Sequence, residues 1–148
     1  MEKYYSTRNT NDRVSFSTGV TRGLSPDGGL YVPESFTNID IYDEKYLKMS
    51  YQELAVDILS NFLDGYTKEE VTTFVSEAYG DNFETKDIVP VKTCDKVNFL
   101  ELFRGPTLAF KDMALQILPK FMVAAARKEG ITDEIVVLTA TSGDTGKA

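Results

Sequence analysis

The sequence contains no histidine and no tryptophan, and Cys94 is its single cysteine among 148 residues. Without histidine, this chain alone cannot supply a Ser–His or Cys–His nucleophile pair, nor a zinc site with imidazole ligands. A lone cysteine excludes an intramolecular disulfide and is typical of a reducing cytoplasm. Acid–base chemistry must therefore come from carboxylates, tyrosines, lysines or a bound cofactor.

Long hydrophobic runs and positive charge are also scarce. No apolar run approaches the ~20 residues that a membrane-spanning helix needs, and the N-terminus lacks the apolar stretch of a secretory signal. The chain carries 16 basic and 23 acidic residues, for a net charge of −7. Because phosphate binding needs clustered Lys and Arg, this balance argues against a nucleic-acid partner. We expect a cytoplasmic globular protein without a membrane or nucleic-acid role.

Short strands are expected near the N-terminus. Residues 14–18 alternate between apolar and polar side chains, which is typical of a strand. Residues 25–29 form a strong turn signal, since proline presets φ and glycines accept positive φ. Residues 30–32 then predict a second strand, so this part favours a β-hairpin or a paired edge segment.

Two amphipathic helices are predicted next. Ser50 with Glu53 and Thr67 with Glu70 have the spacing of capping boxes, and apolar residues follow at helical spacing. Glycines at 65 and 80 are expected to end these helices. The pair predicts a helical hairpin that covers another layer.

The pattern changes after about residue 84. Residues 97–103 predict a buried strand, residues 112–128 a largely apolar helix that Pro119 kinks or divides, and residues 135–139 a β-branched strand. Strand, helix and strand of these lengths predict a right-handed parallel βαβ unit. The expected fold class is therefore α/β, with residues 1–84 and 85–148 as two parts.

Two loops follow the two predicted strands, and we call them the lysine loop (residues 105–112) and the threonine loop (residues 141–146). In open parallel sheets, ligands bind beyond the carboxyl ends of the strands, where both loops are expected. Lys111 lies between Phe110 and Asp112 at a strand-to-helix junction, where an amine can form a Schiff base with an aldehyde. A solvated charge at a helix start is the ordinary alternative.

The threonine loop contains small residues and two glycines at an expected helix start. Such a loop can bind an anion through its backbone amides and the helix dipole. It does not fit the phosphate-binding P-loop pattern, which requires glycine at Thr141 and serine or threonine at Ala148. A generic turn capped by a serine or threonine is the structural alternative.

Three collinear segments resemble the threonine synthase family. They are RGLSPDGGLYVP at residues 22–33, LELFRGPTLAFKD at residues 100–112, and TATSGDTG at residues 139–146. The resemblance covers essentially the whole chain, and the second segment is similar to the family's pyridoxal-phosphate lysine segment. Many members of the family carry histidine at the position of Arg104, so the ligand contact made there is open.

The resemblance implies a fold-type II pyridoxal-phosphate lyase that converts O-phospho-L-homoserine and water to L-threonine and phosphate. Lys111 would hold the cofactor and then move protons as a general base and acid, while Phe110 and Asp144 would lie against the cofactor. Ser142, Gly143, Asp144 and Thr145 match the loop that grips the substrate carboxylate.

The resemblance also implies an N-terminal portion, since members of the family are considerably longer than this chain. The residues that hold the cofactor phosphate and pyridine nitrogen would lie outside it. We therefore expect the isolated chain to be inactive, to bind the cofactor weakly, and to self-associate through the incomplete sheet. The alternatives are a related phospho-lyase that makes no threonine, and a non-catalytic binding module.

Overall fold

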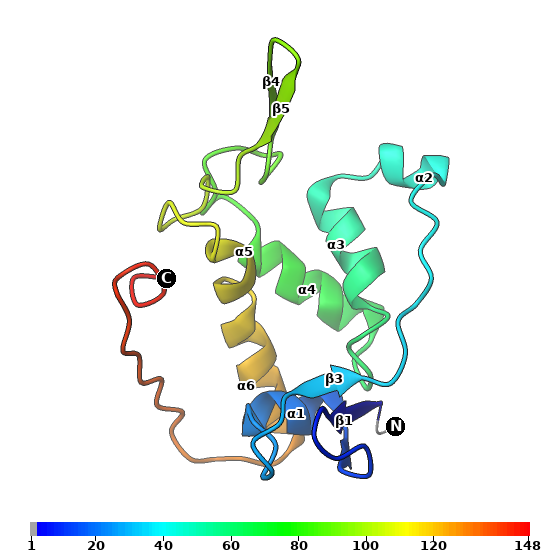
Figure 1. Ribbon diagram of the computed structural model, residues 1–148, viewed down its shortest axis with the longest axis vertical. Coiled ribbons are helices and arrows are strands. Elements are labelled where there is room, and N and C mark those ends of the chain that lie inside the picture. The colour runs from blue at the N-terminus through cyan, green and yellow to red at the C-terminus, as the bar shows by residue number, and fades with distance from the viewer. Residues whose placement is uncertain (1–2) are drawn as a thin grey trace.

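The computed structural model describes residues 3–148 as a mixture of helices and short strands (Figure 1). This agrees with the predicted α/β class of short N-terminal strands followed by a helical hairpin. The elements run in the order β1 (Tyr4–Ser6), β2 (Arg13–Val14), α1 (Phe16–Arg22), β3 (Tyr31–Pro33), α2 (Glu44–Leu47), α3 (Tyr51–Leu59), α4 (Lys68–Ala78), β4 (Val91–Cys94), β5 (Val97–Leu100), α5 (Asp112–Leu115) and α6 (Leu118–Lys128).

The N-terminal strands form a small antiparallel sheet in the order β2-β1-β3. The predicted strand over residues 14–18 is wrong beyond Val14, because Ser15 caps α1 by accepting a 3.1 Å hydrogen bond from the Thr18 amide. A short period-two pattern cannot distinguish a strand from a capped helix start that buries Phe16. The predicted strand at 30–32 is confirmed in β3, but it pairs with β1 rather than with β2.

The helical hairpin is confirmed in α3 and α4. Ser50 accepts from the Glu53 amide at 3.2 Å, and the Glu53 carboxylate accepts from the Ser50 amide at 2.8 Å. Thr67 and Glu70 form the same reciprocal pair. Both helices end before the glycines expected to terminate them, α3 at Leu59 and α4 at Ala78.

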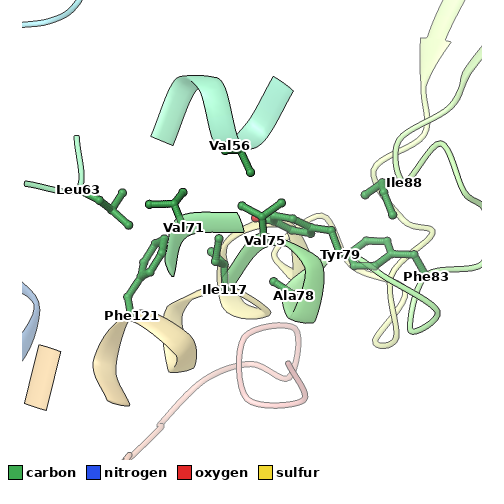
Figure 2. Packing of buried hydrophobic residues seen from close by; sticks show 10 residues of the cluster. All are labelled: Val56, Leu63, Val71, Val75, Ala78, Tyr79, Phe83, Ile88, Ile117 and Phe121. Atoms are coloured by element: carbon green, nitrogen blue, oxygen red, sulfur yellow. The ribbon is translucent and has the colours of Figure 1, made fainter. Parts of the chain in front are cut away.

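The hydrophobic core lies where α3 and α4 meet α6 (Figure 2). Phe121 of α6 packs edge-on against Phe16 of α1 and Phe74 of α4, with ring centroids 5.4 and 5.9 Å apart. The core thus joins residues from both sides of the predicted boundary at 84 and 85. The buried residues of this core are Val56, Leu63, Val71, Val75, Ala78, Tyr79, Phe83, Ile88, Ile117 and Phe121.

The predicted parallel βαβ unit does not form in this structure. β5 pairs antiparallel with β4 in an exposed hairpin that extends from one end of the molecule (Figure 1). Residues 135–139 have no regular secondary structure, and Leu138 is 93% exposed. A strand requires a hydrogen-bonded neighbour, and a β-branched sequence cannot supply one by itself.

The division of the apolar helix at Pro119 is confirmed. α5 ends at Leu115 and α6 begins at Leu118, with Pro119 in its first turn, where the missing amide hydrogen costs no helical bond. Among residues 3–148, no helix combines the length and apolarity needed to cross a bilayer.

Candidate active site

The lysine loop is built around the side chain of Asp112. This carboxylate is fully buried and accepts hydrogen bonds from the Thr107 amide at 2.9 Å and the Thr107 hydroxyl at 2.8 Å. Gly105 packs so closely on it that a Cβ there would lie 2.5 Å from the Asp112 Oδ2 atom. Only glycine fits at position 105, and the loop folds back on itself just before α5.

Lys111 immediately precedes α5 and is partly buried. Its Nζ atom donates a hydrogen bond to the Thr145 hydroxyl and lies 5.9 Å from the centroid of the Phe110 ring. The Phe110 side chain itself is largely exposed. The lysine amine is thus directed at the threonine loop, and the two motifs meet although 34 residues separate the bonded pair.

The threonine loop is organised by the hydroxyl of Thr141. Its Oγ1 atom accepts hydrogen bonds from the amides of Gly143 at 3.2 Å and Gly146 at 3.0 Å. Gly143 has φ of 132°, a conformation that glycine adopts easily. The Lys147 amide then donates to the Gly143 carbonyl at 3.1 Å, which begins a helical turn.

The structure brings some of the predicted site residues into direct contact and places the others nearby in the same loop. Lys111 and Thr145 are bonded directly, whereas Ser142, Gly143 and Asp144 are exposed in the same loop as Thr145. The Asp144 carboxylate forms an ion pair with Lys147 at 3.3 Å. Figure 1 shows the C-terminal turn lying beside the segment that leads into α5.

Arg104 is occupied by two carboxylates. Its guanidinium group lies 2.6 Å from Glu84 and 2.6 Å from Glu101, and the hydrogen bonds that it donates to these two carboxylates, Glu84 first, raise the pKa of Arg104 further. The Arg104 carbonyl also accepts from the Glu84 amide at 2.9 Å. In this structure Arg104 joins the base of the β4–β5 hairpin to the start of the lysine loop.

Sequence reasoning gave no role to Thr107, Asp112 or Tyr79. The Tyr79 hydroxyl donates to the Met113 carbonyl of α5 at 2.5 Å, and burial, with a smaller effect of Tyr51, raises the pKa of Tyr79. The spacing of Thr107 and Asp112 could have suggested a loop closure. Tyr79 gave no such signal, because its partner is a backbone carbonyl from a distant segment.

Comparison with known proteins decides the family. The family described as "Threonine synthase N terminus" matches residues 3–79, which is more than half of the chain. The chain belongs to the threonine synthase family. The family match ends at Tyr79, so the lysine and threonine loops lie beyond it.

Complete relatives extend the similarity to both loops. The chain is 38% identical over 156 residues to a threonine synthase of Methylobacillus glycogenes, covering 99% of this chain and 32% of that protein. It is 36% identical to a threonine synthase of Schizosaccharomyces pombe, covering 98% of this chain and 30% of that protein. The chain therefore spans about a third of the length of these threonine synthases.

Solved threonine synthases share the fold. The Escherichia coli structure superposes with a TM-score of 0.82 at 33% identity, covering 97% of this chain and 32% of that one. A structure from Brucella melitensis, described as pyridoxal-phosphate-bound, has a TM-score of 0.79 at 34% identity over 88% of this chain and 28% of that one.

Proposed function

We propose that this chain is the N-terminal portion of a threonine synthase, which converts O-phospho-L-homoserine and water to L-threonine and phosphate. The observation that carries the proposal is the hydrogen bond from the Lys111 amine to the Thr145 hydroxyl. It joins the two motifs in which the chemistry was predicted. We further propose that the protein works in the cytoplasm, consistent with its one exposed thiol, Cys94.

The residues present fit pyridoxal phosphate. Lys111 is partly buried and its amine is held by a neutral hydroxyl, so no carboxylate of residues 3–148 has to be displaced before the amine can be used. When bound, the cofactor supplies an electron sink for charge that develops on the substrate. Lys111 would hold it through its amine, with Phe110 and Asp144 beside it.

The two loops then have separate tasks. The free Lys111 amine would move protons at Cα and Cβ of the substrate as a general base and acid. The Thr145 hydroxyl would orient that amine. Ser142, Gly143, Asp144 and Thr145 would bind the substrate carboxylate, in a loop whose shape is held by the bonds of the Gly143 and Gly146 amides to the Thr141 hydroxyl.

Replacement of Lys111 tests this proposal in the full-length protein. Lys111→Ala removes the covalent anchor and the proton carrier together, so release of phosphate should fall by on the order of 10³-fold or more. Lys120→Ala is the matched control, because Lys120 lies in α6 and pairs with Glu77 at 2.9 Å. Phosphate and threonine are measured separately: phosphate without threonine would indicate the related phospho-lyase, and turnover retained by Lys111→Ala would contradict the role of Lys111.

The 148-residue chain by itself is proposed to be inactive, to bind pyridoxal phosphate weakly, and to self-associate. The apolar residues 135–138 support self-association, because they are exposed and without regular structure. Titration with pyridoxal phosphate, followed by visible absorbance, measures the affinity. Tight, stoichiometric binding by this chain would contradict the proposal.

A further inference from the structure

We propose that Asp112 is a positioning residue that sets the direction of the Lys111 amine by clamping the lysine loop through Thr107. The inference rests on the proposed function for the catalytic meaning of Lys111. The clamp itself rests on contacts that do not involve any ligand.

The clamp closes the loop that carries the lysine. Asp112 is the first residue of α5, but its side chain turns back along the chain rather than capping the helix that follows. Its two carboxylate oxygens accept from the amide and the hydroxyl of the same residue, Thr107. Lys111 therefore lies inside a closed ring of six residues, next to one of the two residues that close it.

The helix cannot hold Lys111 by itself. α5 contains only four residues, and Lys111 makes no side-chain cap at its start. A single turn of helix is intrinsically unstable, because few hydrogen bonds compensate for the ordering of its residues. Leu108, in the middle of the loop, also has φ of 57°, which a branched side chain rarely adopts. The hydrogen bonds of the buried Asp112 carboxylate therefore stabilise a loop that its own backbone does not hold in place.

The clamp is connected to the hydrophobic core. The Gln116 amide group donates to the Asp112 Oδ1 atom at 3.4 Å, and the Asn82 amide group donates to Gln116 at 3.3 Å. Asn82 in turn donates to the Ala78 carbonyl at the end of α4 at 3.1 Å. A continuous series of hydrogen bonds thus runs from α4 through Asp112 to Thr107.

Conservative and disruptive substitutions separate positioning from simple stability. Asp112→Ala removes both acceptors, whereas Asp112→Asn keeps one oxygen for the Thr107 amide and can donate to the Thr107 hydroxyl after that hydroxyl rotates. The Asn variant loses only the weaker 3.4 Å bond from Gln116, which donates to the same Oδ1 atom. Thr107→Val removes one of the two hydrogen bonds, and Thr107→Ser keeps both. If loop geometry determines activity, Asp112→Asn should keep more activity than Asp112→Ala, and Thr107→Ser should keep more than Thr107→Val.

The decisive experiment combines kinetics with a ligand-free measurement. In the full-length protein, Asp112→Ala should lower kcat for O-phospho-L-homoserine by on the order of 100-fold, the loss expected for a misplacement of about 1 Å. KM should change much less, because a positioning contact acts on the reacting geometry. Thr107→Val should lower kcat by roughly 10-fold, and Asp112→Asn and Thr107→Ser should stay within about 5-fold of the parent.

The ligand-free arm uses the full-length protein without cofactor and hydrogen–deuterium exchange. In Asp112→Ala, the amides of Thr107 and Leu108 should exchange on the order of 10-fold faster, because the loop opens locally. Ser25→Ala is the matched control: Ser25 is also buried, and its hydroxyl donates to Asp12 at 2.7 Å, far from the lysine loop. It should lower the melting temperature without changing kcat or the exchange of the lysine loop.

Several results would overturn the inference. One is an Asp112→Ala protein with parental kcat and parental exchange, and another is a variant that loses stability only, as Ser25→Ala does. If Asp112→Ala fails to fold, Thr107→Val decides, and parental kcat in that variant contradicts the clamp. Turnover retained by Lys111→Ala would instead contradict the proposed function, while the exchange arm still reports whether Asp112 orders the loop.

Discussion

Two regions of the molecule differ in packing. One is formed by α3, α4 and α6, and the other by the β4–β5 hairpin together with residues 131–148. The first contains the buried core, including Val71 and Val75, which are fully buried. The second exposes most of its large apolar side chains, among them Phe99 and Leu138. The candidate site connects the two regions, because Lys111 precedes α5 beside the core and Thr145 lies within residues 131–148. Stability and the proposed chemistry are therefore carried by different residues, and the substitutions below should separate them.

Phe121 should give the largest difference between the two regions. Phe121→Ala leaves a cavity among Phe16, Phe74 and the rest of the core, and should lower the free energy of unfolding by about 3–5 kcal/mol. Leu138→Ala, at an exposed position, should change it by no more than about 0.5 kcal/mol. Urea unfolding of both variants measures the contrast. Equal losses would show that residues 131–148 are packed as firmly as the core.

Tyr79 tests the connection between the regions. Tyr79→Phe leaves the Met113 carbonyl without its phenol donor, and should cost about 1–2 kcal/mol. Burial raises the pKa of Tyr79 above its usual 10.0, so its contribution is complete at neutral pH and is lost as alkaline pH ionises the phenol. The free energy of unfolding, measured from neutral to alkaline pH, should thus fall less steeply in Tyr79→Phe than in the parent. An unchanged slope would contradict this role.

The capping boxes should give the smallest effect, confined to the packed region. Ser50→Ala removes the acceptor for the Glu53 amide and should cost about 1 kcal/mol, with Thr67→Ala as the equivalent change in α4. The backbone hydrogen bond from Ser50 lowers the pKa of Glu53 below its usual 4.5. The contribution of Glu53 is therefore present at neutral pH and is lost as the pH falls through the lowered pKa. Glu53→Gln should flatten this acid dependence in urea unfolding, and a parental dependence would contradict it.

The parts of the fold that could be predicted depend on near neighbours in the sequence. A capping box involves residues three apart, and Pro119 divides its own helix, so both were visible without a structure. Strand β1 was missed because it has only three residues and is defined by its partners β2 and β3. The strand at 135–139 failed for the same reason, since its β propensity found no neighbouring strand.

In the candidate site, too, the features set by neighbouring residues were predicted and those set by distant contacts were not. The lysine and threonine motifs were recognised from local sequence, and their encounter was expected from the ends of two parallel strands. The structure brings Lys111 and Thr145 together without that parallel pair, because the segment that follows α6 runs back to the level of α5 (Figure 1). The clamp from Asp112 to Thr107 was not predicted. The spacing of the two residues allows a loop closure, but it does not show in which direction the Asp112 side chain turns.

The bond between Lys111 and Thr145 also has a consequence for the order of folding. It closes a loop of 34 residues that contains α5 and α6, and bringing such ends together costs conformational entropy that grows with loop length. Nothing within residues 131–140 compensates for this cost with regular structure. The two motifs should therefore meet only after α6 has docked on α1 and α4, which places assembly of the lysine site among the last kinetic steps of the chain.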